Sequence, residues 1–275
     1  MDALEKGKVH AGELSPEEFQ IVSKDLEKYK NINIYSDQMN GVVFLLLNIR
    51  SEKFKNQNIR SWVYKTIADK FNVSGTFRKF TKKARQYFLP GGKGHLSSKF
   101  LDKKLSAVPL GKVDGKLLEK FKMDIVTTPS MRSYLPGNIE SHLKEILQAP
   151  VSISYNVDGN YEKFIEGRRF EAHLMAASMS YKVLSEALNL KYNSKPPEAL
   201  DPSGKVRELL AKYQREDDPE EEKKIIGAIL EQMIDDAEII PLFFFSGPMF
   251  IDNKVLSGKE MHFSESFQIW KLRQN

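Results

Sequence analysis

The sequence predicts an α/β fold in which a mixed, largely parallel sheet is flanked by helices. Two apolar runs, GVVFLLLNI (41–49) and AEIIPLFFFSGPMFI (237–251), are typical of strands that are buried on both faces. Between them, residues 123–190 alternate between strand-like and helix-like patterns. This alternation predicts right-handed crossovers and a parallel arrangement of the strands that they connect.

Apolar spacing defines the elements of the first half of the chain. A helix is predicted at 15–29, where a serine N-cap and a proline at the first helical position precede one apolar stripe. Alternation at 31–37 predicts a strand, which is followed by the buried strand at 41–49 and an amphipathic helix at 58–71. Residues 74–110 show a less regular pattern, in which LPGGKG is expected to form an open turn.

The second half continues as strands and helices in alternation. The predicted strands cover 123–129, 151–158 and 169–179, and the predicted helices cover 138–148, 160–168, 180–190, 206–216 and 219–236. In parallel sheets, ligands bind beyond the carboxyl ends of the strands and near helix N-termini. This rule points to the junction at 177–181. There the hydroxyls of Ser178, Ser180 and Tyr181, with exposed backbone N–H groups, are expected to form a small polar or anionic site.

The apolar run near the C-terminus is interpreted as a buried strand followed by a hinge. A membrane helix needs roughly 18 apolar residues without a breaker, and Pro241 interrupts this run after a few residues. A strand that is entered through this proline and closed by Gly247 and Pro248 fits the pattern better. Phe243 and Phe245 on this strand are candidate ligand contacts, with a purely structural role as the favoured alternative.

Composition and missing motifs argue against catalysis. The chain has no cysteine, which removes thiol catalysis, disulfides and zinc–thiolate sites. Its 5 histidines form no HxH or HExxH pair, and no GxSxG or GxGxxG motif is present. His173 is expected to be a hydrogen-bonded core residue. No catalytic residue, metal ligand or cofactor is therefore predicted, and a binding protein is the leading class.

Three stretches together resemble the extracellular solute-binding proteins of family 5, the oligopeptide and dipeptide receptors of bacterial ABC importers. The stretches are 3–22, 42–70 and 230–258. The third is similar to the family's final helix, its Ile-Pro strand of aromatic residues and its return to the first lobe. The match in the second stretch is carried by Asn48, Phe54, Asn56, Ile59 and Arg60.

The resemblance implies a lobe of a type 2 periplasmic binding protein with hinge flanks from the other lobe. Residues 1–40 would be a remnant of the first lobe and hinge, 41–245 the second lobe, and 246–275 the return segment. The implied protein is not an enzyme. It captures peptides or a similar small solute between two lobes and delivers the solute to an ABC permease in the membrane.

The resemblance also implies an exported protein, periplasmic or membrane-associated. The N-terminus has no signal-peptide pattern, and the N-terminal lobe is missing, so the chain is expected to be a fragment. One lobe supplies one wall of the binding cleft. The isolated chain is therefore expected to bind peptide no tighter than about millimolar.

The chain departs from the family at the junction after the predicted strand at 169–179. Peptide receptors carry a Trp and an Asp there that grip the amino terminus of the peptide, whereas Ala177 and Ser180 occupy approximately these places here. A buried carboxylate that faces an ammonium contributes on the order of 1.5–3 kcal/mol, and a serine lacks its charge. The protein is not expected to select ligands by a free peptide amino terminus.

Two alternatives stay open. The first is a noncatalytic relative that uses the same fold as a sensor or partner-binding module. The second is a basic anion or nucleic-acid binder, because the net charge is +5 and basic residues interleave with aromatic ones in KFTKKARQYF. A solvated helix face gives the same spacing, so no nucleic acid is predicted as a partner. A continuous positive face would favour the second alternative; its members would be Arg78, Lys79, Lys82, Lys83 and Arg85.

Overall fold

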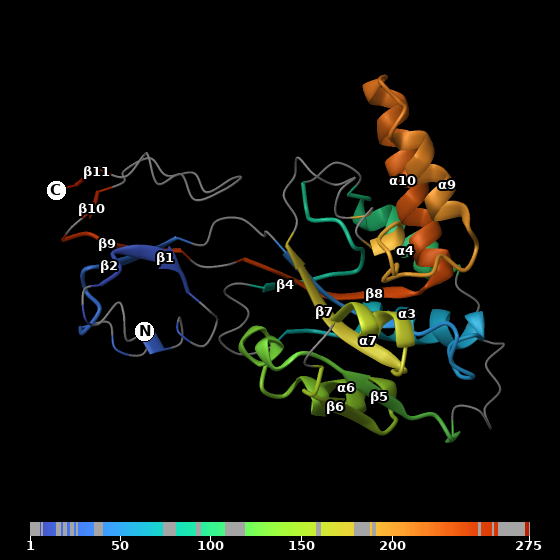
Figure 1. Ribbon diagram of the computed structural model, residues 1–275, viewed down its shortest axis with the longest axis horizontal. Coiled ribbons are helices and arrows are strands. Elements are labelled where there is room, and N and C mark those ends of the chain that lie inside the picture. The colour runs from blue at the N-terminus through green and yellow to red at the C-terminus, as the bar shows by residue number, and fades with distance from the viewer. Residues whose placement is uncertain are drawn as a thin grey trace.

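The computed structural model contains two separate sheets and one further strand pair (Figure 1). In the described part of the chain, the larger sheet has six strands and the smaller has three. The residues that the structure describes are 6, 8–14, 18, 21–22, 25, 27–35, 41–73, 81–91, 95–107, 119–157, 161–178, 188, 191–246, 249–254, 256–257 and 273–274.

The six-stranded sheet has the order β4-β8-β3-β7-β5-β6. Its strands are β4 (Thr81–Lys83), β8 (Ile239–Phe245), β3 (Gly41–Leu47), β7 (Ala172–Ser178), β5 (Met123–Val126) and β6 (Val151–Ser154). The α/β fold class and the predicted parallel arrangement within 123–179 are confirmed, because β5 runs parallel to both β6 and β7. The expectation that the sheet is largely parallel is wrong. β3 runs opposite to β7 and β8, and β4 runs opposite to β8, so the sheet is mixed.

Helices cover both faces of this sheet. They are α3 (Gln57–Lys70), α4 (Ser98–Ser106), α6 (Ile139–Leu147), α7 (Tyr161–Gly167), α9 (Lys205–Tyr213) and α10 (Pro219–Asp236), with a 3-10 helix η3 at Pro129–Tyr134. Successive residues of β3 enter two different core clusters, which lie on opposite faces of the sheet. All seven residues of β3 are buried, as the apolar run predicts.

The three-stranded sheet joins segments from both ends of the chain. Its order is β1-β9-β2, with β1 (Ala11–Glu13), β9 (Met249–Asp252) and β2 (Ile32–Tyr35) antiparallel to their neighbours. A small apolar cluster packs on it, formed by Leu14, Val22, Tyr29 and Phe250. Beside it, β10 (Leu256–Ser257) pairs with β11 (Arg273–Gln274). The segments 1–40 and 246–275 thus meet in this sheet, and the division into lobes stays a prediction.

Two short elements occur where the sequence shows little regularity. Within 74–110 the chain forms β4 and α4, and the Ser97 side chain caps α4 by accepting a hydrogen bond from the Phe100 N–H. The buried spacing of Leu101 and Leu105 on α4 is helical, but it extends over one turn only. The predicted helices at 15–29 and 180–190 lie mostly outside the described residues.

Pro241 lies inside β8 and does not open the strand. The register between β3 and β8 shifts between Val43 and Phe44, so that Val43 faces Phe243 and Phe44 faces Pro241. A proline has no N–H to donate, and such an irregularity lets an internal strand accommodate it. All seven residues of β8 are buried. None of the helices within the described residues has the length and the apolar composition of a membrane span.

Candidate functional site

The candidate site lies at one edge of the six-stranded sheet, which we call the carboxyl edge. β5, β6, β7 and β8 end toward this edge, and β3 begins there, since Gly41 pairs with both Ser178 and Phe245. Residues 246–248 are all that separates β8 from β9, so the carboxyl edge faces the three-stranded sheet (Figure 1). Ligands of open α/β sheets bind at such edges.

The short helix η3 (Pro129–Tyr134), which we call the step, lies at the carboxyl edge. β5 ends beside His173, well before β7 ends at Ser178, and η3 follows β5 directly. Thr127 fixes this exit from β5, because its buried hydroxyl donates a hydrogen bond to the Leu174 carbonyl at 2.7 Å. At the other end of η3, the Tyr134 ring lies 5.8 Å from the Phe245 ring at the end of β8. The step therefore contacts β7 at its start, through Thr127, and β8 at its end, through Tyr134.

The step carries an exposed arginine, Arg132. The guanidinium of Arg132 lies 4.6 Å from the ring centre of Tyr155, the residue that directly follows β6. In the part of the chain that the structure describes, no carboxylate pairs with Arg132. Burial raises the pKa of the Tyr155 hydroxyl, which keeps this ring neutral beneath the cation. Arg132 is thus a cation that is oriented by an aromatic ring and that pairs with no anion among the described residues.

The neighbouring groups are polar. The hydroxyls of Thr128 and Ser130 lie 2.9 Å apart at the start of η3. Glu140 and Arg132 both influence the pKa of Tyr155, Arg132 lowering it and Glu140 raising it, so a carboxylate lies in the same vicinity without pairing with Arg132. Glu140 instead accepts hydrogen bonds from Lys144 and from the Ile153 backbone. Within the described residues, the site can therefore supply the unpaired guanidinium of Arg132 and several neutral hydroxyls.

The site residues predicted from the sequence are only partly described. Ser178 ends β7 at the carboxyl edge, while its side chain, Ser180 and Tyr181 lie outside the described residues. Phe245 is also at this edge and is 9% exposed. Phe243 is fully buried and stacks on Phe71 at 6.2 Å in the core. The structure thus brings Ser178 and Phe245 together and places Phe243 in the interior, and a role for these residues in ligand binding stays a prediction.

The sequence interpretation missed Arg132, Tyr134 and Tyr155. A signal was present for the first two, because polar and aromatic residues directly follow the predicted strand at 123–129, whereas Tyr155 lies inside the predicted strand at 151–158. The rule that ligands bind at the carboxyl ends of strands also covers the ends of the first two strands of the series. Applied to the strand at 123–129, the rule points to Arg132 and Tyr134, whereas Tyr155 follows a strand only because β6 ends earlier than predicted, at Ser154.

His173 is a core residue, but the expectation that it is hydrogen-bonded is not met at Nδ1. Within the described residues, this nitrogen has no hydrogen-bond partner, and the side chain is surrounded by aromatic rings of Tyr161, Phe164 and Phe170. Burial lowers the pKa of His173 to about 3, with a smaller contribution from Lys191. The imidazole is therefore neutral and packs as an aromatic side chain.

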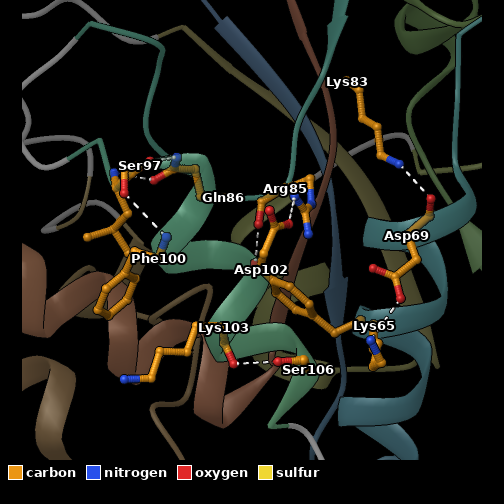
Figure 2. A network of polar contacts seen from close by, with 12 residues as sticks. Lys65, Asp69, Lys83, Arg85, Gln86, Ser97, Phe100, Asp102, Lys103 and Ser106 are labelled. Carbon is orange, nitrogen blue, oxygen red and sulfur yellow. Dashed lines mark hydrogen bonds and ion pairs between the residues drawn. The ribbon is translucent and has the colours of Figure 1, made fainter.

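Two of the basic residues near β4, Lys83 and Arg85, are compensated by carbonyl and acidic groups. Figure 2 shows Arg85 paired with Asp102 at 2.6 Å, and Lys83 donating a hydrogen bond to the Asp69 carbonyl at 2.8 Å. The carboxylate of Asp69 pairs with Lys65 at 2.8 Å. Lys82 is exposed, and Arg78 and Lys79 lie outside the described residues. Positive and negative groups thus alternate here, which is typical of a solvated surface and argues against a continuous positive face.

Solved structures of the same fold are available for comparison. No protein-family model matches the chain, and no curated protein matches it. The periplasmic binding protein DppA from Helicobacter pylori, in complex with the peptide STSA, superimposes with a TM-score of 0.70 at 18% identity, covering 99% of this chain and 54% of DppA. The oligopeptide-binding protein AppA from Bacillus subtilis, in complex with a nonapeptide, gives 0.66 at 17% identity, covering 100% and 57%. NikA from Brucella suis, in complex with Fe(III)-EDTA, gives 0.69 at 14% identity, covering 99% and 59%.

These similarities agree with the family that the sequence resembles. The chain spans about half the length of the proteins that it matches, and the similarity extends over nearly all of its own residues. The expected type of lobe is confirmed at the level of the fold. This chain has the fold of the family 5 solute-binding proteins of ABC transporters, over about half of their length.

Proposed function

We propose that the chain is the second lobe of a substrate-binding component of an ABC importer. The whole protein would be exported, would capture a peptide or a similar small solute between two lobes, and would deliver it to a membrane permease. The fold supports this proposal, since DppA and AppA are described in complexes with peptides and NikA in a complex with a metal chelate. The role is binding and not catalysis.

The unpaired guanidinium of Arg132 indicates which class of solute the protein would bind. A guanidinium presents two parallel N–H donors that match a carboxylate, and the stack on Tyr155 holds this fork in place. Because no carboxylate of the described chain occupies it, a ligand can supply the missing anion. We assign to Arg132 the binding of an anionic group of the solute, such as the terminal carboxylate of a peptide. Ser178, Ser180, Tyr181 and Phe245 would contact other parts of the solute.

Arg132→Ala should weaken binding of an acidic solute by about ten- to a hundredfold, the equivalent of one lost charge-assisted hydrogen-bond pair. Calorimetry on the full-length protein would compare the peptide Ser-Thr-Ser-Ala with its C-terminal amide. The loss should appear with the free acid and be small with the amide. Arg132→Lys should recover part of the affinity, because it keeps the charge and loses the fork.

The matched control is Arg215→Ala, which removes another exposed arginine from the connection between α9 and α10. It should bind the free acid as the unmodified protein does. Equal losses with the acid and the amide would contradict the role of Arg132. If the unmodified protein binds neither these peptides nor any member of a broader panel of peptides and metal chelates, the proposed function itself is wrong.

A further inference from the structure

β6, one of the two terminal strands of the six-stranded sheet, has an open edge as far as the described residues show. β6 is the terminal strand of the sheet, and within the described chain its single strand partner is β5 (Figure 1). The backbone N–H groups of Met123 and Thr127 donate to the carbonyls of Pro150 and Ser154. Because alternate residues of a strand point to opposite sides, Val151 and Ile153 direct their backbone groups away from β5. Such groups are a template for pairing with another strand.

Glu140 occupies this open edge. It lies in the first turn of α6, and its Oε2 accepts a hydrogen bond from the outward-facing N–H of Ile153 at 3.0 Å. Its Oε1 accepts one from Lys144 Nζ, one turn further along the helix, at 2.8 Å. Lys144 and the Ile153 N–H together hold the pKa of the Glu140 carboxyl below its ordinary value, so a charge sits at the edge at neutral pH. A helix side chain thus fills the position that a neighbouring strand would take.

The opposite edge of the sheet is protected by other means. β4 is three residues long, and two of them are Lys82 and Lys83. Short length and lysines are ordinary devices against edge pairing. β6 carries no lysine, and the segment VSISYNV (151–157) contains no charge, no proline and several β-branched residues. Protection of this segment against pairing with another strand must therefore come from a residue outside β6.

We infer that Glu140 prevents the edge of β6 from pairing with β6 of a second copy of this chain. A second copy is the matching occupant because two identical edges can pair antiparallel about a twofold axis, with the same residues on both sides. The pairing would extend past Ser154 to Tyr155 and would cover the ring on which Arg132 stacks. Glu140 therefore keeps the candidate site accessible and also prevents self-association.

Glu140→Ala tests the inference on the 275-residue chain. Sedimentation velocity over a concentration series should show self-association at least about tenfold tighter than that of the unmodified chain, which corresponds to about 1.4 kcal/mol. Hydrogen exchange should show that the Ile153 amide, protected in the unmodified chain, exchanges faster in the dilute variant. Glu140→Gln is the matched control, because its amide oxygen can still accept from Ile153, and its association should stay close to the unmodified level.

A second substitution locates the association. In the double variant E140A/I153P, the proline removes the outward N–H and leaves the bonds to β5 in place, because residue 153 does not donate to that strand. The added association should disappear. The inference is wrong if Glu140→Ala associates no more than the unmodified chain, if the Ile153 amide keeps its protection, or if the double variant associates as strongly as the single one.

Discussion

Glu238→Ala is expected to lower the free energy of unfolding by on the order of 3–5 kcal/mol. Glu238 precedes β8 and is 1% exposed. Its two carboxylate oxygens accept hydrogen bonds from the backbone N–H groups of Leu200 at 2.7 Å and Asp201 at 2.9 Å. Alanine would leave the buried donor of Asp201 and the half-buried donor of Leu200 without this partner, and a buried donor without a partner costs about 1–3 kcal/mol.

The two donors belong to a loop that two arginine side chains also hold. Arg207 donates to the carbonyls of Tyr192, Ala199 and Leu200, and Arg168 donates to those of Pro197 and Glu198. Loss of Glu238 therefore frees one end of a loop whose remaining contacts depend on the same geometry. Urea unfolding followed by circular dichroism would measure the change.

The control is Glu166→Ala, which removes an exposed glutamate from α7. Its effect should stay within about 0.5 kcal/mol. A loss below about 1 kcal/mol in Glu238→Ala would show that water replaces the carboxylate and that the loop does not depend on it.

The same carboxyl makes stability depend on pH. Burial raises the pKa of Glu238 from 4.5 to about 7, although the two backbone N–H groups, Arg168 and Arg60 act in the opposite direction. Between these two values the folded chain binds this proton and the unfolded chain does not. The stability that the proton provides is therefore full below pH 4.5 and is lost as the pH rises to about 7. The loss is on the order of 3 kcal/mol.

Comparison with Glu238→Gln isolates this effect from other titrating groups. The free energy of unfolding of the unmodified chain, relative to that of Glu238→Gln, should fall as the pH rises from 4.5 to about 7 and then become constant. Asp236, whose pKa is also raised by burial, is present in both proteins and cancels in this difference. A relative stability that rises with pH would mean that the carboxyl is held in its charged form, against the effect of burial.

The sequence predicts the central strands because their burial leaves a local signal. β3 and β8 lie between two helical layers, so nearly every residue is apolar, and the run itself is the evidence of the position. The units from β5 to β7 are likewise visible, since strands and helices alternate along the chain and β5 pairs with both β6 and β7. The direction in which a strand runs leaves less signal in its own sequence than its burial does. Whether β3 runs with or against β7 depends on which side the chain enters from, and that entry comes from the three-stranded sheet.

The candidate site is predictable in part for the same reason. The rule for strand ends identifies Ser178, whereas Tyr155 lies inside the predicted strand at 151–158 and follows a strand only in the structure. The stack of Arg132 on Tyr155 requires that β5 and β6 be adjacent, and the bonds of Glu238 require the loop near Leu200 to fold back on β8. Both contacts join residues that are distant in sequence and carry no shared pattern. They become visible when the pairing of the strands is known.

Gly41→Ala is expected to destabilise the chain by about 1–3 kcal/mol, the usual cost of forcing extra volume into a packed core. Gly41 begins β3 and pairs with Phe245 across the sheet. A Cβ atom at this position would lie 2.2, 2.4 and 2.8 Å from Cζ, Cε1 and Cε2 of the Phe245 ring. Contacts under 3.0 Å are essentially never seen for a real Cβ, so the ring would have to move. It packs at 5.8 Å from Tyr134, which anchors η3, so the step that carries Arg132 would move with it.

A double-mutant cycle with Phe245→Ala separates this clash from a general effect of alanine. In the Phe245→Ala background, Gly41→Ala should cost less than about 0.5 kcal/mol, because the ring is gone and alanine is itself better than glycine inside a strand. Gly227→Ala on α10 is the matched control, since no atom lies within 4 Å of its added Cβ, and it should stabilise the chain by about 0.5–1 kcal/mol. If Gly41→Ala costs as much without the Phe245 ring as with it, the close approach of this ring is not the reason that the position is a glycine.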